Sequence, residues 1–194
     1  MEHKTRKSAK TQERIVTCAA ELMTERGSAT FKMSEVSQNC NMSKGALYYY
    51  FSDKDDLVDA VFDREMDEVV GLVNSALSNG STALDSLRNL CTEFGHRATE
   101  GPILAMALIH DLSCAASKSG IMDTRFQTMI TNVADTIQAS INEGSMRADV
   151  NPYLSSISLC GALCFAALNA KSEKGLPEDF IDVLLAQALN GIGA

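Results

Sequence analysis

Apolar residues recur at three- and four-residue spacing along most of the chain, which is the pattern of amphipathic α-helices. The first such segment begins at Ser8 or Thr11, and Gly27 stands where it ends, as a helix terminator. Two short periodic segments and a long one follow. The pattern predicts N-terminal helices at about 8–26, 33–39, 43–50 and 54–79.

The rest of the chain continues the helical pattern, interrupted by Gly-Pro, Ser-Gly, Asn-Pro and Gly-Leu-Pro segments. Only 3 prolines and 12 glycines are present, and β-branched runs are few, which favours helix throughout. We therefore expect an all-α protein of about nine helices, with an N-terminal region (1–54) on a C-terminal helical bundle (55–194). The further helices are expected at about 82–98, 102–116, 121–143, 152–171 and 177–191.

The two short helices are separated by Cys40-Asn41-Met42, and Asn tolerates the left-handed conformation that such a turn requires. Ser52 to Asp56 supplies an N-cap and a carboxylate-rich first turn for the long helix. A short helix, a three-residue turn and a second short helix form a helix-turn-helix, whose second helix enters the DNA major groove.

The second short helix has two unlike faces. An advance of 100° per residue places Leu47, Tyr50 and Phe51 toward a core. The opposite face carries one lysine, one glycine and two tyrosines, which is unusual for a solvated surface but suits DNA. Lysine neutralises phosphate or binds guanine, glycine permits close approach, and tyrosine hydroxyls bond to phosphate oxygens. This second face consists of Lys44, Gly45, Tyr48 and Tyr49.

The charge distribution supports this interpretation even though the net charge is −8. Residues 1–54 hold nine Lys or Arg and six Asp or Glu, a net of +3, whereas the remaining 140 residues hold eight and nineteen, a net of −11. A basic segment on an acidic body is a pattern of nucleic-acid-binding proteins. The basic residues before position 11 are expected to form a mobile arm, which either is solvated or reaches into a groove.

From Ile15 to Leu57 the sequence resembles the DNA-binding region of TetR-type transcriptional regulators. The core of the resemblance is Ser43-Lys44-Gly45-Ala46-Leu47-Tyr48-Tyr49-Tyr50-Phe51, followed by Lys54 and Leu57. It implies a homodimer that binds operator DNA through its N-terminal region and a small inducer through its body. Carried over residue by residue, it implies recognition-helix contacts from Lys44, Gly45, Tyr48 and Tyr49 and a phosphate contact from Lys54. Further candidate DNA contacts are Lys32, Ser43 and Ala46.

Three positions depart from the family pattern. Lys32 stands where a capping Thr or Ser is usual, which leaves the cap of the first short helix to Thr30 or to water. Ser37 replaces a packed Ala, and Asn41 replaces the usual turn Gly. None of these departures is expected to break the fold.

The segment 152–171 is apolar on nearly every side, so it needs a partner on the side that does not face its own core. With the amphipathic helix after it, this segment could form a four-helix interface about a two-fold axis, as the resemblance also implies. The residues expected in this dimer interface are Leu154, Ile157, Gly161, Ala162, Phe165, Ile181, Leu184, Leu185 and Ala188.

A ligand site is expected in the body, although the same residues also suit a packed core. Nine methionines suggest an adaptable apolar cavity, hence an apolar or aromatic inducer. His110 is either the polar anchor of that pocket or a hydrogen-bonded core histidine. The candidate lining is Phe62, Met66, Leu87, Phe94, Met106, His110, Phe126, Met129 and Phe165.

The sequence gives little support for redox chemistry, metal binding or catalysis. Cys160 and Cys164 lie one helical turn apart, but their apolar neighbours favour packing over a redox or metal pair. Neither a nucleophile beside a base nor a phosphate-binding glycine loop nor a set of metal ligands is evident, so we expect no enzyme, cofactor or metal. The expected function is a cytoplasmic, nucleoid-associated, ligand-responsive repressor that binds a palindromic operator. The alternative is a helical small-molecule-binding dimer whose N-terminal region has lost specific DNA binding.

Overall fold

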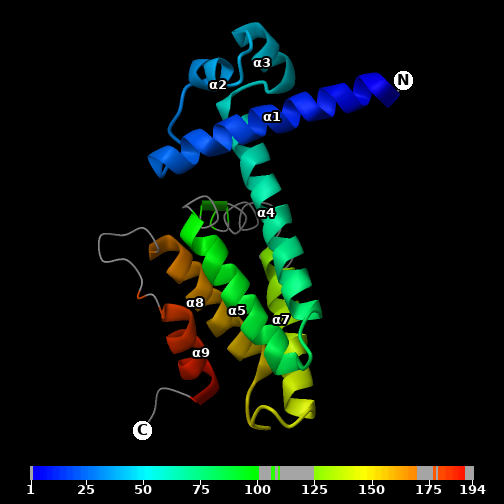
Figure 1. Cartoon of the computed structure of the whole chain (residues 1–194), viewed down its shortest axis with the longest axis vertical. Coiled ribbons are helices and arrows are strands. Elements are labelled where there is room, and N and C mark those ends of the chain that lie inside the picture. Colours follow the sequence, from blue (N-terminus) through cyan, green and yellow to red (C-terminus); the bar gives the residue numbers. More distant parts are fainter. Residues whose placement is uncertain are drawn as a thin grey trace. The chain divides into compact units, whose positions relative to one another are not determined.

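The computed structural model describes residues 2–100, 106, 107, 109, 125–169, 177 and 179–190, and each regular element among them is an α-helix (Figure 1). This confirms the all-α expectation. The helix expected at 102–116 lies outside the described residues except for 106, 107 and 109, which are helical. The others are α1 (Glu2–Arg26), α2 (Met33–Asn39), α3 (Lys44–Tyr50), α4 (Lys54–Ser78), α5 (Ala83–Glu100), α7 (Arg125–Asn142), α8 (Pro152–Asn169) and α9 (Phe180–Asn190).

The chain divides into two compact units, residues 1–65 and 66–194, and the division falls inside α4. In the first unit, α1 packs against α2 and α2 against α3. Its centre is formed by fully buried apolar side chains from α1 to α4, spaced as the sequence pattern requires. They are Ile15, Ala19, Met23, Val36, Leu47, Leu57 and Val61.

The start of α1 corrects the expectation of a mobile arm, because residues 2–10 continue the helix. This segment has no apolar stripe, which is why periodicity alone did not predict a helix there. It also contains neither Gly nor Pro and is rich in Lys, Arg, Glu and Ala, which favour helix intrinsically. At the other end Gly27 has φ +61° and the Ser28 N–H donates to the Met23 carbonyl at 3.2 Å, a helix-terminating arrangement.

The second unit is built around α5, α7 and α8, which pack against one another (Figure 1). Ion pairs join the C-terminal part of α4 to two of them: Arg97 lies 3.5 Å from Glu68, and Arg125 lies 3.2 Å from Asp67. α9 packs on α5 at Gly95, where an added Cβ would lie 2.5 Å from Cδ1 of Ile181. Within the described residues, none of the helices has the length and hydrophobicity needed to cross a membrane.

Candidate functional site

The turn between α2 and α3 is tightly hydrogen-bonded. Asn41 has φ +51°, the left-handed conformation expected of it. The Asn41 N–H donates to the Gln38 carbonyl at 3.0 Å, and the Met42 N–H donates to the Ser37 carbonyl at 2.9 Å. These bonds satisfy carbonyls at the end of α2 and set the direction in which the chain enters α3.

Ser43 begins α3 as its N-cap, with its side-chain oxygen accepting from the Ala46 N–H at 3.2 Å. Leu47 is fully buried and Phe51 is buried at the far end, so these two residues fix the inner face of α3. Tyr50 is only half-buried, less than the sequence pattern predicts, and its ring packs edge-on against Tyr49 with centroids 5.2 Å apart. The capped and anchored helix is thus held at both ends.

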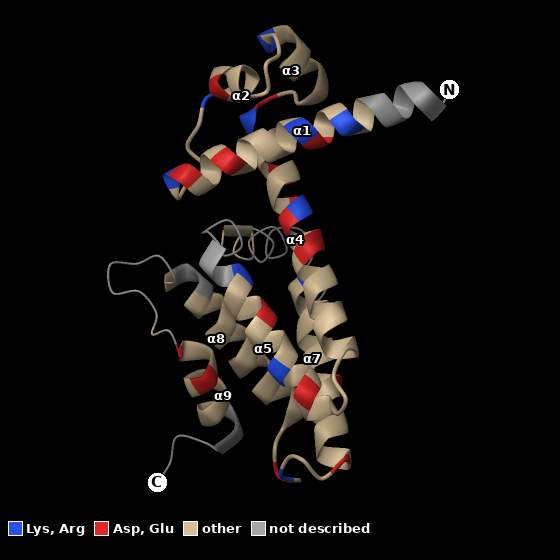
Figure 2. Ribbon diagram, viewed as in Figure 1, with Lys and Arg blue, Asp and Glu red and all other residues tan. Residues whose placement is uncertain are grey.

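The outer face of α3 is the one predicted from the sequence. The side chain of Tyr49 is 82% exposed and that of Tyr48 is 43% exposed, and Lys44 and Gly45 are exposed as well. The Lys44 Nζ lies 5.8 Å from the centroid of the Tyr48 ring, so the cation and the phenol occupy one surface. Figure 2 shows basic but no acidic colouring on α3, whereas acidic residues lie on α1 and on α4. We call Lys44, Gly45, Tyr48 and Tyr49 the α3 outer face.

Gly45 has no role in the packing of the described chain. A Cβ added there would meet no atom within 4 Å, and the residue lies in the ordinary helical region without a positive φ. A glycine inside a helix is unfavourable relative to alanine by roughly 0.5–1 kcal/mol. The fold therefore does not explain this residue, whereas close approach of an external molecule would.

Lys54 is the first residue of α4. Its side chain is half-buried, and its Nζ lies 5.4 Å from the centroid of the Phe31 ring. The Asp56 N–H donates to the Asp53 carboxylate at 2.9 Å, and the Ser52 N–H donates to the Asp56 carboxylate at 2.9 Å. This reciprocal arrangement confirms the predicted cap. Because Asp53 already binds one of the first N–H groups of α4, the contribution of Lys54 to an anion site is mainly its charge.

At Lys32 the cap differs from the expected one. The Lys32 N–H donates to Glu35 at 2.6 Å, and the same carboxylate binds Arg26 at 2.7 and 3.2 Å, which ties the end of α1 to the start of α2. Thr30 instead accepts from Arg26 through its carbonyl, at 2.8 Å. The hydrogen bond from Arg26 lowers the pKa of Glu35 to about 2, and the Lys32 N–H adds to this effect. The glutamate at the third helical position was a sequence signal for this bond, because Glu at that position commonly accepts a hydrogen bond from the N–H of the N-cap residue.

The second unit exposes apolar residues on α8. Phe165 is 70% exposed, Leu154 60% and Ile157 40%, while Leu159 and Leu163 on the same helix are buried. Gly161, Ala162, Ile181, Leu184 and Leu185 are half-buried, and the side chain of Ala188 lies outside the described residues. The residues predicted for a dimer interface thus share an exposed face in α8 but extend into the protein interior in α9, where Ile181 packs on Gly95.

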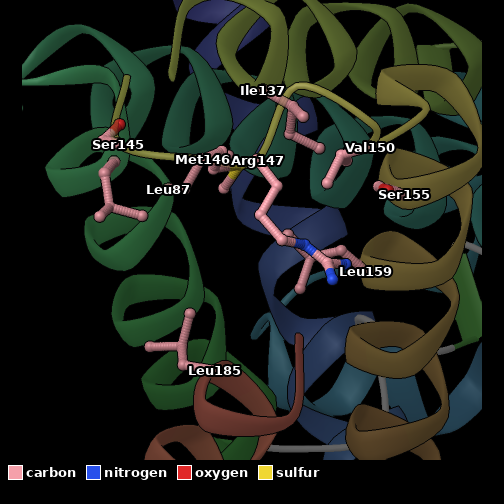
Figure 3. Close-up of a pocket in the computed structure, with 10 residues that line it drawn as sticks. Leu87, Ile137, Ser145, Met146, Arg147, Val150, Ser155, Leu159 and Leu185 are labelled. Atoms are coloured by element: carbon pink, nitrogen blue, oxygen red, sulfur yellow. The ribbon is translucent and has the colours of Figure 1, made fainter. Parts of the chain in front are cut away.

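A cavity of about 450 Å³ lies within the second unit (Figure 3). Of the predicted ligand-site residues that the structure describes, Leu87 alone lines it. The other lining residues come from α5, α7, α8, α9 and the loop between α7 and α8. They are Leu84, Ile137, Ser145, Met146, Arg147, Val150, Ser155, Leu159 and Leu185.

The remaining predicted ligand-site residues are dispersed. Phe94, Phe126 and Met129 line a separate cavity of only about 20 Å³, far below the roughly 300–1,000 Å³ of small-molecule sites. Phe62 and Met66 are buried, Met106 is half-buried and Phe165 is exposed. His110 lies outside the described residues. Most of this predicted set therefore packs as core, and the loop residues that line the larger cavity were not predicted.

Among the described cysteines of the second unit, Cys91 and Cys160 are buried and Cys164 is half-buried. Burial raises the pKa of the Cys91 and Cys160 thiols to about 12, and Cys164 is raised similarly, so all three are protonated near neutral pH. Protonated, buried thiols act as packing residues, as predicted for Cys160 and Cys164. Among the described residues, no group of three or more His, Cys, Asp or Glu side chains is placed to hold a metal ion.

The N-terminal geometry is that of a helix-turn-helix, and comparison with known proteins defines its class. Residues 15–61 match the model of the bacterial regulatory proteins of the tetR family. This N-terminal stretch is therefore similar to the DNA-binding region of that family. It is 23% identical over 150 residues to the HTH-type transcriptional regulator UidR of Escherichia coli (strain K12), a stretch that covers 75% of this chain and 74% of that protein.

Solved structures share the fold over nearly the whole chain. The fatty acid degradation regulator FadR from Bacillus halodurans superposes with a TM-score of 0.75 at 16% identity, covering 93% of this chain and 95% of that chain. AibR, solved in complex with isovaleryl coenzyme A and operator DNA, superposes with a TM-score of 0.71 at 21% identity, covering 92% and 98%. At such identities the likeness establishes the fold alone.

Proposed function

We propose that this protein is a ligand-responsive transcriptional repressor that binds double-stranded operator DNA through the α3 outer face. The observation that carries the proposal is the exposure of a lysine, a glycine and two tyrosines on one side of a capped helix. Phosphate contacts from Lys and Tyr, with close backbone approach at Gly45, are the interactions that such a face can make. Ser43 and Ala46 adjoin this face in the sequence and are proposed as additional contacts. The same is proposed for Lys32 at the start of α2 and Lys54 at the start of α4.

Operator binding by a homodimer is part of the proposal. Two copies joined through α8 and α9 would present two α3 helices to a palindromic site. The exposed apolar residues of α8 support this, because soluble monomers rarely expose contiguous hydrocarbon surfaces of this kind.

The effector is proposed to bind in the second unit and to act through α4. This helix is continuous from Lys54 to Ser78, so one element belongs to both the DNA-binding unit and the body. For an effector to release DNA, it must bind the DNA-incompetent conformation more tightly than the competent one. AibR, a structural neighbour solved with an acyl thioester and operator DNA, supports the general scheme.

DNA binding is tested with fragments from upstream of the protein's own gene, at two salt concentrations. The test variant is Lys44→Ala/Tyr48→Ala. The matched control is Arg88→Ala, which removes an exposed cation from α5 in the second unit. We expect specific binding that weakens steeply with salt, is retained by the control and is lost in the test variant.

Absence of specific binding to these fragments and to random-sequence DNA would overturn the proposal. It would favour the alternative of a ligand-binding dimer that has lost DNA recognition. Equal loss of binding in the control and test variants would also contradict a role for the α3 outer face.

A further inference from the structure

The 450 Å³ cavity has the chemistry of a small-molecule site. Seven of its ten lining residues are apolar, and the remaining three are Ser145, Arg147 and Ser155. A largely apolar concavity with a few polar groups, in the range of roughly 300–1,000 Å³, is the usual form of such sites. The apolar lining residues are Leu84, Leu87, Ile137, Met146, Val150, Leu159 and Leu185.

One wall of the cavity is fixed by the way in which α7 ends. Gly144 has φ +76°, and the N–H groups of Ser145 and Met146 donate to the Ser140 carbonyl at 3.0 and 3.2 Å. The Ser145 hydroxyl donates to the same carbonyl at 2.9 Å. This hydrogen-bonded helix terminus fixes the backbone just before Arg147, and so fixes the point from which the Arg147 side chain extends.

The other end of the loop is also held. The Asn151 side chain accepts from the Leu154 N–H at 3.0 Å and so caps α8, with Pro152 in the first helical position. The Glu143 carboxylate accepts from the Ala83 N–H at 3.0 Å, which joins the start of the loop to the start of α5. The loop is therefore attached to three helices, and the cavity beneath it is preformed.

Among the described residues that line the cavity, Arg147 alone is charged. Figure 3 shows its side chain pointing into the cavity from the loop. Its side chain is 75% exposed, and its Nε lies 3.6 Å from Oδ1 of Asp149, which is exposed as well. A guanidinium presented in this way suits bidentate pairing with a carboxylate.

The geometry points to an aliphatic carboxylic acid of about ten carbons as the ligand of this cavity. We propose that its carboxylate pairs with Arg147 and that its chain lies among the leucines of α5, α8 and α9. The volume of about 450 Å³ lies toward the lower end of the roughly 300–1,000 Å³ of small-molecule sites, which favours a ligand of about this size.

This inference deepens the proposed function, since it names the class of the effector, and it rests on that function for its regulatory meaning. Ligand binding is nevertheless measured without DNA. Decanoate that binds to a protein lacking operator affinity would overturn the proposed function alone. Operator binding by a protein without affinity for decanoate would overturn the present inference alone.

The experiment is isothermal titration of the full-length protein with decanoate, decanol and acetate. Decanol keeps the chain without the charge, and acetate keeps the charge without the chain. Arg147→Met removes the guanidinium while keeping an unbranched apolar stem. Arg88→Met is the matched control, because Arg88 is exposed on α5 and does not line the cavity.

A second variant, Val150→Phe, fills the cavity from the loop without changing any charge. Circular dichroism and thermal unfolding establish that each variant is folded before titration. This variant distinguishes two modes of binding. It should prevent binding of the chain inside the cavity, but it should not affect binding of the carboxylate to Arg147 alone.

We expect one decanoate per chain, with binding about three- to fivefold weaker in Arg147→Met, because an ion pair with an exposed guanidinium contributes roughly that factor. Decanol and acetate should bind at least as weakly as that variant binds decanoate. Val150→Phe should lose decanoate binding, and Arg88→Met should keep it. Undetectable binding of decanoate by the wild type, or unchanged affinity in either cavity variant, would overturn the inference.

Discussion

The outer faces of α3 and α8 both expose large side chains, but they differ in what those side chains offer a partner. On α3, Tyr49 is 82% exposed and lies on the same face as a lysine and a glycine. On α8, Phe165 is 70% exposed and Leu154 60%, without a charged group anywhere in the helix. Phenol hydroxyls and an ammonium group suit a polyanion, whereas bare hydrocarbon suits another apolar protein surface. Exposed large side chains mark both faces as candidate interfaces, and the accompanying polar atoms indicate which partner each would suit.

The two faces also differ in how the fold supports them. α3 has only seven residues, so a helix of its length depends on its cap at Ser43 and on the buried Leu47. α8 has eighteen residues and is held by a buried row that includes Leu159 and Leu163. A substitution on the outer face of either helix should therefore alter association and leave folding largely intact.

The largest effect is expected on the α8 face. Phe165→Asp should raise the dimer dissociation constant by about a hundredfold or more, because a carboxylate would be buried against hydrocarbon in the dimer. Light scattering across a concentration series measures this constant. Gln138→Asp, which places the same charge on an exposed site of α7, is the control. Dimers of unchanged affinity in Phe165→Asp would exclude this face as the interface.

A smaller effect is expected where the turn supports the α3 face. Asn41→Ala should lower the free energy of unfolding by about 1 kcal/mol, because alanine tolerates φ +51° less well than asparagine. Asn41→Gly should not lower it, since glycine adopts this conformation freely. Urea denaturation followed by circular dichroism measures both values. Equal destabilisation by the two substitutions would show that the asparagine side chain, and not its backbone, matters.

The smallest effect is expected from the ion pair between Arg26 and Glu35, because both groups are exposed to solvent. The pKa of Glu35 is lowered to about 2 in the folded protein, so its stabilising contribution is present above the ordinary value of 4.5 and is lost as the pH falls toward 2. Glu35→Gln keeps an acceptor for the Lys32 N–H but abolishes this titration. Thermal unfolding between pH 7 and pH 3 should therefore show a weaker acid dependence in the variant. Identical pH profiles would contradict a stabilising pair.

Much of the first unit could be predicted because its elements carry local signals. Ser43 and Asp53 cap helices, Gly27 ends one, and Asn41 adopts the left-handed turn. The bond between Arg26 and Glu35 could not be found in this way, because it joins two helices whose relative placement depends on the packed core. The α3 outer face was predictable since helical periodicity alone separates it from Leu47.

The cavity was less predictable than the helices around it. The sequence pattern identifies apolar residues but does not distinguish those that fill space, such as Met66, from those that border it, such as Leu84. The cavity depends on the loop between α7 and α8, where no periodicity applies. Arg147 was conspicuous only as a cation in a predominantly acidic body, a signal too general to assign it to a pocket.

The most direct test of the central claim is the substitution Gly45→Ala, measured for both stability and operator binding. A methyl group at this position meets no atom of the described protein, so the free energy of unfolding should rise by roughly 0.5–1 kcal/mol. If DNA approaches the α3 outer face closely at Gly45, the same variant should bind operator about tenfold more weakly, with dimerisation unchanged. Higher stability together with undiminished operator affinity would contradict the claim that this face lies against DNA.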